Sequence, residues 1–393
     1  MKKLTDISGV YASGVYCGLK SDSSKLDLAY LYVPNATASA GVFTKNKFKA
    51  ACIGHTEQAL KNDTIKAVII NSGCANAATG PEGLENCKIT AEKAADLLGI
   101  KSSQVATAST GIIGVQLDMK KVIPGLETLL RNPERKELEH AANAILTLDT
   151  KIKLAFAEKG KLQVGGFAKG AGMISPNMAT MLGFIVTNVA LNSTTLKRLL
   201  QNACNDSFNM ISVDTDTSTN DLVLIISTGE IQAEEVKEEE ISELIRQCSI
   251  SLAKQIAADG EGAEKLIEAS VKGASSDSEA RIVAKNLINS PLVKTAIHGA
   301  DPNWGRLMMA IGKDPSVKFN ADEIDVYLAG QLVFTNGRPA KFERENLRKL
   351  LASNEVKIDV NLNCKTSDGL NYSAVAWGCD LTKKYIDINT DYN

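Results

Sequence analysis

A glycine-rich segment that runs into an apolar strand pattern places the strongest constraint on this chain of 393 residues. Gly170 and Gly172 permit backbone conformations that are closed to other residues, and the pair Pro176–Asn177 is typical of a turn. The apolar run 181–186 that follows predicts a strand entering a core. Thr180 therefore stands at the junction of a sharply bent loop and a buried strand.

This position suits a hydroxyl nucleophile. A threonine hydroxyl is a weak nucleophile until a nearby base takes its proton, and the α-amine freed by cutting the Ala179–Thr180 bond would be that base. The alternative interpretation of the same residues is a glycine-rich connector that leads into a core strand and has no catalytic role.

Composition places the chain among globular proteins, with 44% hydrophobic and 23% charged residues. The length fits about two or three structural units. The net charge of −2 gives no general attraction to nucleic acid or anionic membranes. Residues 1–6 carry two lysines with no apolar stretch behind them, and no apolar run reaches the ~18 residues of a membrane span. We therefore expect a cytoplasmic protein with small-molecule partners, no nucleic-acid partner and no membrane association.

The cysteines and histidines predict neither disulfides nor a metal. The eight cysteines form no CxxC pair and have apolar or small neighbours, so we expect buried, reduced thiols. His55, His140 and His298 are far from one another and from any cysteine or carboxylate at ligand spacing. Three distant ligands could still meet in space.

Short apolar runs alternate with helical patterns along the chain, which predicts a compact α/β fold. Near-continuous apolar residues predict buried strands at 67–70, 184–186 and 222–226. An amphipathic helix is expected over 241–256 after the acidic run 234–240, and a second helix after a cap at 192–195. Residues 324–328 and 332–334 predict a hairpin. Apolar and polar residues alternate over 356–362, which predicts a strand in a sheet with one solvated or differently covered face.

Residues 169–184 as a whole resemble the maturation site of the ornithine acetyltransferase family, the glutamate N-acetyltransferases of arginine biosynthesis. Precursors in that family cut themselves before this threonine. Similar segments recur in chain order over nearly the whole sequence, at 40–44, 71–77, 107–114, 146–150, 215–221, 259–263, 298–306 and 388–392.

The resemblance implies self-cleavage between Ala179 and Thr180, with Thr180 as the nucleophile and a substrate-binding residue. The products would be an N-terminal fragment, 1–179, that carries the oxyanion site, and a C-terminal fragment, 180–393. It also implies an N-terminal-nucleophile-like α-β-β-α sandwich of two facing sheets covered by helices. The two fragments would remain associated, commonly as two of each in a heterotetramer.

The oxyanion site is expected at Thr110 and Gly111. Thr110 offers a hydroxyl and Gly111 a backbone N–H that no side chain shields. Taken alone, such a Ser/Thr/Gly cluster is usually a turn. The resemblance adds Thr147 as a substrate-binding residue, although Leu148 stands where the family has a second threonine.

Three further residues are assigned to the substrate by resemblance. Lys169 could pair with a substrate carboxylate, or be an ordinary surface lysine. Glu261, between two glycines, suits a cationic side chain or leaving amine, and its alternative is an acid in a loop at a helix end. Asn389 fits the family's substrate-binding asparagine. Family members usually carry Thr or Ser five residues later, whereas the sequence ends at Asn393, so no terminal partner is assigned.

The expected activity is transfer of acetyl from N²-acetylornithine to glutamate through an acetyl-threonine, without a cofactor. The sequence leaves open whether acetyl-CoA is a second donor. One rival is an autoprocessed amidase or aminopeptidase of the related fold, in which water accepts the acyl group. A second is a non-catalytic ligand-binding protein that stays uncut. A third is a pyridoxal enzyme with a Schiff base on Lys169, which would absorb at roughly 320–500 nm.

Overall fold

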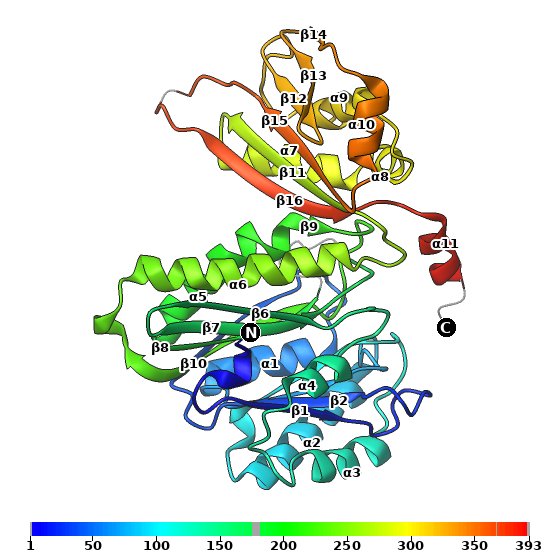
Figure 1. The fold of residues 1–393 in the computed structure, drawn as a ribbon. Helices are drawn as coiled ribbons and strands as arrows, with labels where there is room; N and C mark the ends of the chain where they lie inside the picture. Colours follow the sequence, from blue (N-terminus) through cyan, green and yellow to red (C-terminus); the bar gives the residue numbers. More distant parts are fainter. Residues whose placement is uncertain (1, 175–180, 367, 391–393) are drawn as a thin grey trace. The chain divides into compact units, whose positions relative to one another are not determined.

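The computed structural model describes residues 2–174, 181–366 and 368–390 (Figure 1). The chain divides into two compact units. The first comprises residues 1–170, 176–209 and 216–252, and the second comprises 171–175, 210–215 and 253–393. These units do not coincide with the two fragments expected from cleavage, because both sides of the expected cut contribute to each unit. The fragment boundary stays a prediction.

The first unit contains two sheets. The four-stranded sheet has the order β1 (Tyr11–Val15), β2 (Leu28–Tyr32), β4 (Ala67–Asn71) and β5 (Val105–Ser109). Only its β4–β5 pair is parallel. The five-stranded sheet has the order β3 (Ala38–Phe43), β10 (Leu222–Gln232), β8 (Leu182–Ala190), β7 (Leu162–Lys169) and β6 (Lys153–Lys159). Its β8–β10 pair is parallel, and its other pairs are antiparallel.

The two sheets share one core. Val68 of β4 belongs to the same cluster of buried side chains as Phe184 of β8 and Leu224 of β10. The rings of Phe167 and Phe184 stand 5.1 Å apart in this cluster. Helices α1 (Ala51–Asn62) and α4 (Leu138–Ala144) contribute to the same core and pack along the sheets, α1 on β5 and β3 and α4 on β1 and β2.

Helices cover the other face of each sheet. Tyr30 of β2 and Ile69 of β4 pack with α2 (Gly80–Leu98) and α3 (Met119–Leu129) in a second buried cluster. Beside the five-stranded sheet lie α5 (Ser193–Asp206) and α6 (Glu238–Ala258) (Figure 1). The predicted α/β fold with two helix-covered sheets is confirmed, but α1 and α4 lie between the two sheets (Figure 1), so the sheets do not pack directly on each other as the α-β-β-α prediction required.

The second unit is built on a seven-stranded sheet that the sandwich prediction did not include. Its strands, in order, are β14 (Arg338–Pro339), β13 (Gln331–Thr335), β12 (Asp325–Leu328), β15 (Glu355–Asn361), β11 (Leu266–Ala274), β16 (Tyr372–Cys379) and β9 (Ile211–Ser212). Its helices are α7 (Asp277–Asn289), α8 (Pro291–His298), α9 (Trp304–Gly312), α10 (Arg344–Leu351) and α11 (Lys383–Thr390). Helix α7 packs against β11 and β16.

The expected local elements are confirmed. Helix α5 begins after Asn192, whose side chain accepts a 2.8 Å bond from the Thr195 amide. Strands β12 and β13 form the hairpin, turning at Ala329 and Gly330 with positive φ. All eight cysteines are free thiols, and Cys17 and Cys364 are the two that are partly exposed. Among the described residues, no helix combines the length and the apolar character that crossing a membrane requires.

Candidate active site

The expected oxyanion site directly follows β5. Gly111 has a φ of +131°, and a Cβ built on it would lie 2.4 Å from the carbonyl carbon of Gly73 and 2.6 Å from the amide nitrogen of Cys74. Only glycine fits there. The Gly111 N–H has no backbone acceptor in the described part of the chain, whereas the Thr110 amide donates to the Asn71 carbonyl. The Gly111 N–H remains the second donor expected for the oxyanion.

The ammonium group of Lys169 donates hydrogen bonds to two of the other residues expected at the site. Lys169 is the last residue of β7, and its side chain is 9% exposed. The Nζ atom donates to Thr147 Oγ1 at 2.8 Å and to Thr110 Oγ1 at 3.3 Å. Since an ammonium group has only donors, both hydroxyl oxygens must accept. The Thr110 hydroxyl hydrogen is then free to point at another acceptor. This arrangement overturns the surface-lysine interpretation of Lys169.

A buried carboxylate that the sequence did not reveal, that of Asp149, lies next to these residues. It accepts from Lys153 Nζ at 2.7 Å and from the Gly170 amide at 2.6 Å, and its other oxygen lies 3.7 Å from Lys169 Nζ. Burial raises the pKa of Asp149, but Lys169 and Lys153 outweigh this and hold it well below its usual range. Its place two residues after Thr147 was the available signal.

Glu261 and Asn389 meet in the second unit. Asn389 Nδ2 donates to Glu261 Oε2 at 2.8 Å, and the Glu261 amide donates to the Ala171 carbonyl at 2.9 Å. A Cβ on Gly172 would lie 1.9 Å from Glu261 Oε1. The second glycine of the loop is therefore the residue that leaves room for this carboxylate.

Ala179 and Thr180 lie outside the described residues, as does the turn expected at Pro176–Asn177. On the N-terminal side, Asp214 accepts from the amides of Met173 at 2.6 Å and Ile174 at 2.8 Å. No sequence pattern pointed to Asp214 in this role. Further along the chain, strand β8 begins at Leu182, as predicted from the apolar run.

The polar segment 215–221 supports the oxyanion strand. The Asn220 side-chain amide donates to the carbonyls of Ala75 at 2.6 Å and Ser109 at 2.8 Å. These bonds hold the end of β5 next to Thr110. The neighbouring Asp221 is fully buried, and that burial raises its pKa well above the usual value. The segment thus has the framing role that a polar turn predicts.

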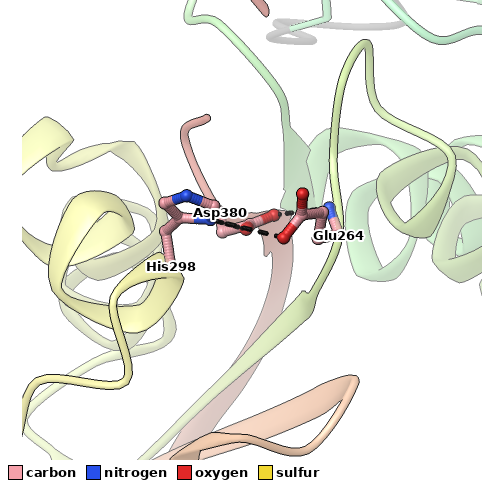
Figure 2. A group of neighbouring side chains, drawn as sticks. All are labelled: Glu264, His298 and Asp380. Atoms are coloured by element: carbon pink, nitrogen blue, oxygen red, sulfur yellow. Dashed lines mark hydrogen bonds and ion pairs between the residues drawn. The ribbon is translucent and has the colours of Figure 1, made fainter. Parts of the chain in front are cut away.

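Three residues distant in sequence could together offer ligand atoms to a metal ion. Figure 2 shows Glu264, His298 and Asp380, whose ligand atoms lie within 4.8 Å of one another. His298 Nδ1 is 2.9 Å from Asp380 Oδ2 and 3.7 Å from Glu264 Oε2. Asp380 Oδ1 also accepts from the amides of Glu264 and Lys265, both at 2.9 Å. These contacts tie the start of β11 to the ends of α8 and β16, a structural role that needs no ion.

Comparison with known proteins gives one consistent relationship. Residues 11–393 match the family described as "ArgJ family". The chain is 42% identical over 395 residues to the "Arginine biosynthesis bifunctional protein ArgJ" of Bacillus licheniformis, covering 98% of this chain and 95% of the relative. Its identity to the protein of the same name from Bacillus subtilis is 43% over 396 residues, with the same coverage.

A solved structure shows the same relationship as the sequence comparisons. The crystal structure of the arginine biosynthesis bifunctional protein ArgJ from Bacillus halodurans is 40% identical, with a TM-score of 0.50. That match covers 53% of this chain and 99% of the other. Identity of this order, extending over almost the whole length of the relatives, is shared by the members of one family. The chain therefore belongs to the ArgJ family.

Proposed function

We propose that the protein transfers an acetyl group from N²-acetylornithine to glutamate, after cleaving itself between Ala179 and Thr180. The observation that carries the proposal is the group formed by Lys169, Thr147 and Thr110, in which one buried ammonium bonds both hydroxyls. Membership of the ArgJ family, whose named relatives belong to arginine biosynthesis, supports the substrates.

In the proposed first half-reaction, the α-amine of Thr180 takes the proton from its own hydroxyl, and the oxygen attacks the acetyl carbonyl. The Thr110 hydroxyl and the Gly111 N–H stabilise the resulting oxyanion. Lys169 supports this step, because its bond to Thr110 Oγ1 leaves the hydroxyl hydrogen for the oxyanion. The C–N bond then breaks, the leaving amine takes the proton, and ornithine departs from an acetyl ester of Thr180.

In the second half-reaction, the α-amine of glutamate attacks the ester carbonyl. The amide bond forms, the proton lost by that amine returns to the threonine oxygen, and N-acetylglutamate leaves. The chemistry needs no cofactor, since the ester conserves the transfer potential of the donor amide. The word "bifunctional" in the relatives' names supports a second activity, and we propose acetyl-CoA as the second donor.

Intact mass under denaturing conditions tests the processing step. We expect two fragments, one ending at Ala179 and one beginning with Thr180, and a single chain for Thr180→Ala. Two of each fragment should associate, which the native mass tests. An uncut wild-type chain after prolonged incubation would overturn the mechanism.

Trapping tests the acyl-enzyme. Protein quenched with acetylornithine and no glutamate should carry one acetyl group on the fragment that begins with Thr180. Turnover of donor without glutamate would instead favour the amidase. Acetylation that requires acetyl-CoA would remove acetylornithine from the donor role.

A further inference from the structure

A pocket of about 430 Å³ lies in the first unit, next to the Lys169 group. Its polar lining includes Lys20, Lys25, Asn143, Thr147 and Asp149. Thr147 connects the pocket to the group described above, because its hydroxyl also accepts from Lys169 Nζ at 2.8 Å. A ligand bound at Thr147 can therefore extend into this pocket. The mechanism above assigns no role to Lys20 or Lys25.

The loop that carries Lys20 is held in place before any ligand arrives. Asp27 is fully buried, and its carboxylate accepts from the amides of Cys17 at 2.6 Å, Gly18 at 3.1 Å and Lys20 at 3.0 Å. The Lys20 ammonium itself donates to the Leu26 carbonyl at 2.7 Å. An ammonium has three N–H donors, so two remain for a ligand. Fixing a cation in this way lowers the entropic cost of binding an anion.

The charges around Lys20 favour an added anion. Burial lowers the pKa of Lys20 to about 8; Lys25 and Lys169 act in the same direction, and Asp27 and Asp149 oppose it. Both of those carboxylates are already bonded, Asp27 to backbone amides and Asp149 to Lys153 and the Gly170 amide. A ligand carboxylate would supply the negative charge that the ammonium lacks.

We propose that this pocket is the subsite for the side-chain carboxylate of the acceptor amino acid, with Lys20 as its principal contact. The inference rests on the proposed function and assigns the acidic class of acceptor to particular residues. The acceptor fits better than the donor, because the side chain of ornithine ends in a cation, which Lys20 and Lys25 repel. A neutral side chain of equal length, such as that of glutamine, gains no ion pair with Lys20.

The two half-reactions, measured separately, test the subsite. Cleaved enzyme is first acetylated with acetylornithine, and ornithine release is followed. After removal of small molecules, glutamate or glutamine is added, and loss of the acetyl group is followed by mass spectrometry. A charge-assisted bond is worth ~1.5–3 kcal/mol. Lys20→Met should therefore lower kcat/KM for glutamate by roughly 10- to 100-fold, mostly through KM, and that for glutamine by less than about twofold.

Two variants serve as controls. Lys20→Arg keeps the cation and should retain most of the preference for glutamate. Lys161→Met removes an exposed lysine of the same unit and should leave the preference at the wild-type value. Circular dichroism and the denaturation midpoint of Lys20→Met establish that its fold is intact.

The outcomes separate this inference from the proposed function. Equal losses with glutamate and glutamine would overturn the subsite and leave the transfer reaction standing. Slower ornithine release in Lys20→Met would show that Lys20 contacts the α-carboxylate shared by both substrates, which also overturns it. A wild-type protein that forms no acetyl-enzyme from acetylornithine would overturn both.

Discussion

The carboxylate of Asp149 accepts a 2.6 Å hydrogen bond from the backbone N–H of Gly170. The same carboxylate is paired with Lys153 at 2.7 Å and lies 3.7 Å from Lys169 Nζ. One buried group thus orients the lysine that bonds Thr147 and fixes the first glycine of the loop. The Asp149 side chain therefore sets both the backbone position of Gly170 and the charge beside Lys169.

Asp149→Asn should destabilise the protein strongly. The change keeps the size of the side chain but removes its charge, so the buried ion pair with the Lys153 side chain, which is 1% exposed, is lost. Breaking a buried pair from one side costs about 3–5 kcal/mol. Chemical denaturation should register a loss of this order. Glu57→Gln, which removes the partly exposed pair with Lys49, is the control and should cost less than about 1 kcal/mol. Similar losses in both variants would contradict the buried pair's role.

His55 should make stability depend on pH. Burial lowers its pKa from 6.5 to about 4, with a smaller contribution from Lys88. Between these values the unfolded chain binds a proton that the folded protein does not, so stability falls as pH drops from 6.5 to 4. The effect amounts to about 3 kcal/mol at most. Denaturation midpoints from pH 7.5 downward should show this slope, and His55→Gln should reduce it. An unchanged slope in the variant would assign the dependence to other groups.

The fold was largely predictable where burial is continuous along the sequence. The run 222–226 contains only apolar residues, and β10 is the strand it predicts, buried between two neighbours in the sheet. The hairpin was predictable because Gly330 permits the positive φ that its turn requires. The order of strands in the seven-stranded sheet was not predictable. Its strands β9 and β16 are hydrogen-bonded neighbours, although more than half of the residues of the second unit lie between them in the sequence.

The sequence predicted which residue types belong to the candidate site, but not the contacts that these residues make in the fold. Resemblance indicated Lys169, yet its burial and its two threonine acceptors depend on the fold. Asp149 gains its role from contacts with Lys153 and the Gly170 amide, which no local pattern reveals. Whether His298 meets carboxylates stayed open for the same reason, because its partners lie 34 and 82 positions away along the chain.

Thr110→Ala should lower kcat by about 10²-fold or more, because an oxyanion donor matters most when charge has developed. Steady-state kinetics with acetylornithine and glutamate measure this loss in kcat. Thr110→Ser restores the hydroxyl that accepts from Lys169 Nζ at 3.3 Å and should recover most of the activity. A raised KM with unchanged kcat would mean that Thr110 binds the ground state.

Glu261→Gln should impair acetylornithine more than an acetylated amino acid with a neutral side chain. The variant keeps size and hydrogen bonding to Asn389 but removes the charge that suits a cationic side chain. The ratio of kcat/KM values for the two donors is the measurement, and Glu264→Gln, a nearby exposed acid in the same unit, is the control. Equal losses for both donors would show that Glu261 contacts the shared end of the substrate or is structural.

Gly172→Ala should displace the Glu261 carboxylate within the second unit without unfolding that unit. The added methyl group would lie 1.9 Å from Glu261 Oε1, so the carboxylate should shift and disturb the 2.8 Å bond that its Oε2 atom accepts from Asn389. The donor preference measured for Glu261→Gln should therefore reappear in Gly172→Ala. Gly54→Ala is the matched control, because a Cβ there meets nothing within 4 Å and helix α1 favours alanine. It should leave the kinetics unchanged and raise stability slightly. A Gly172→Ala protein with the wild-type donor preference would show that the loop can shift to accommodate the methyl group, and that Gly172 does not set the position of Glu261.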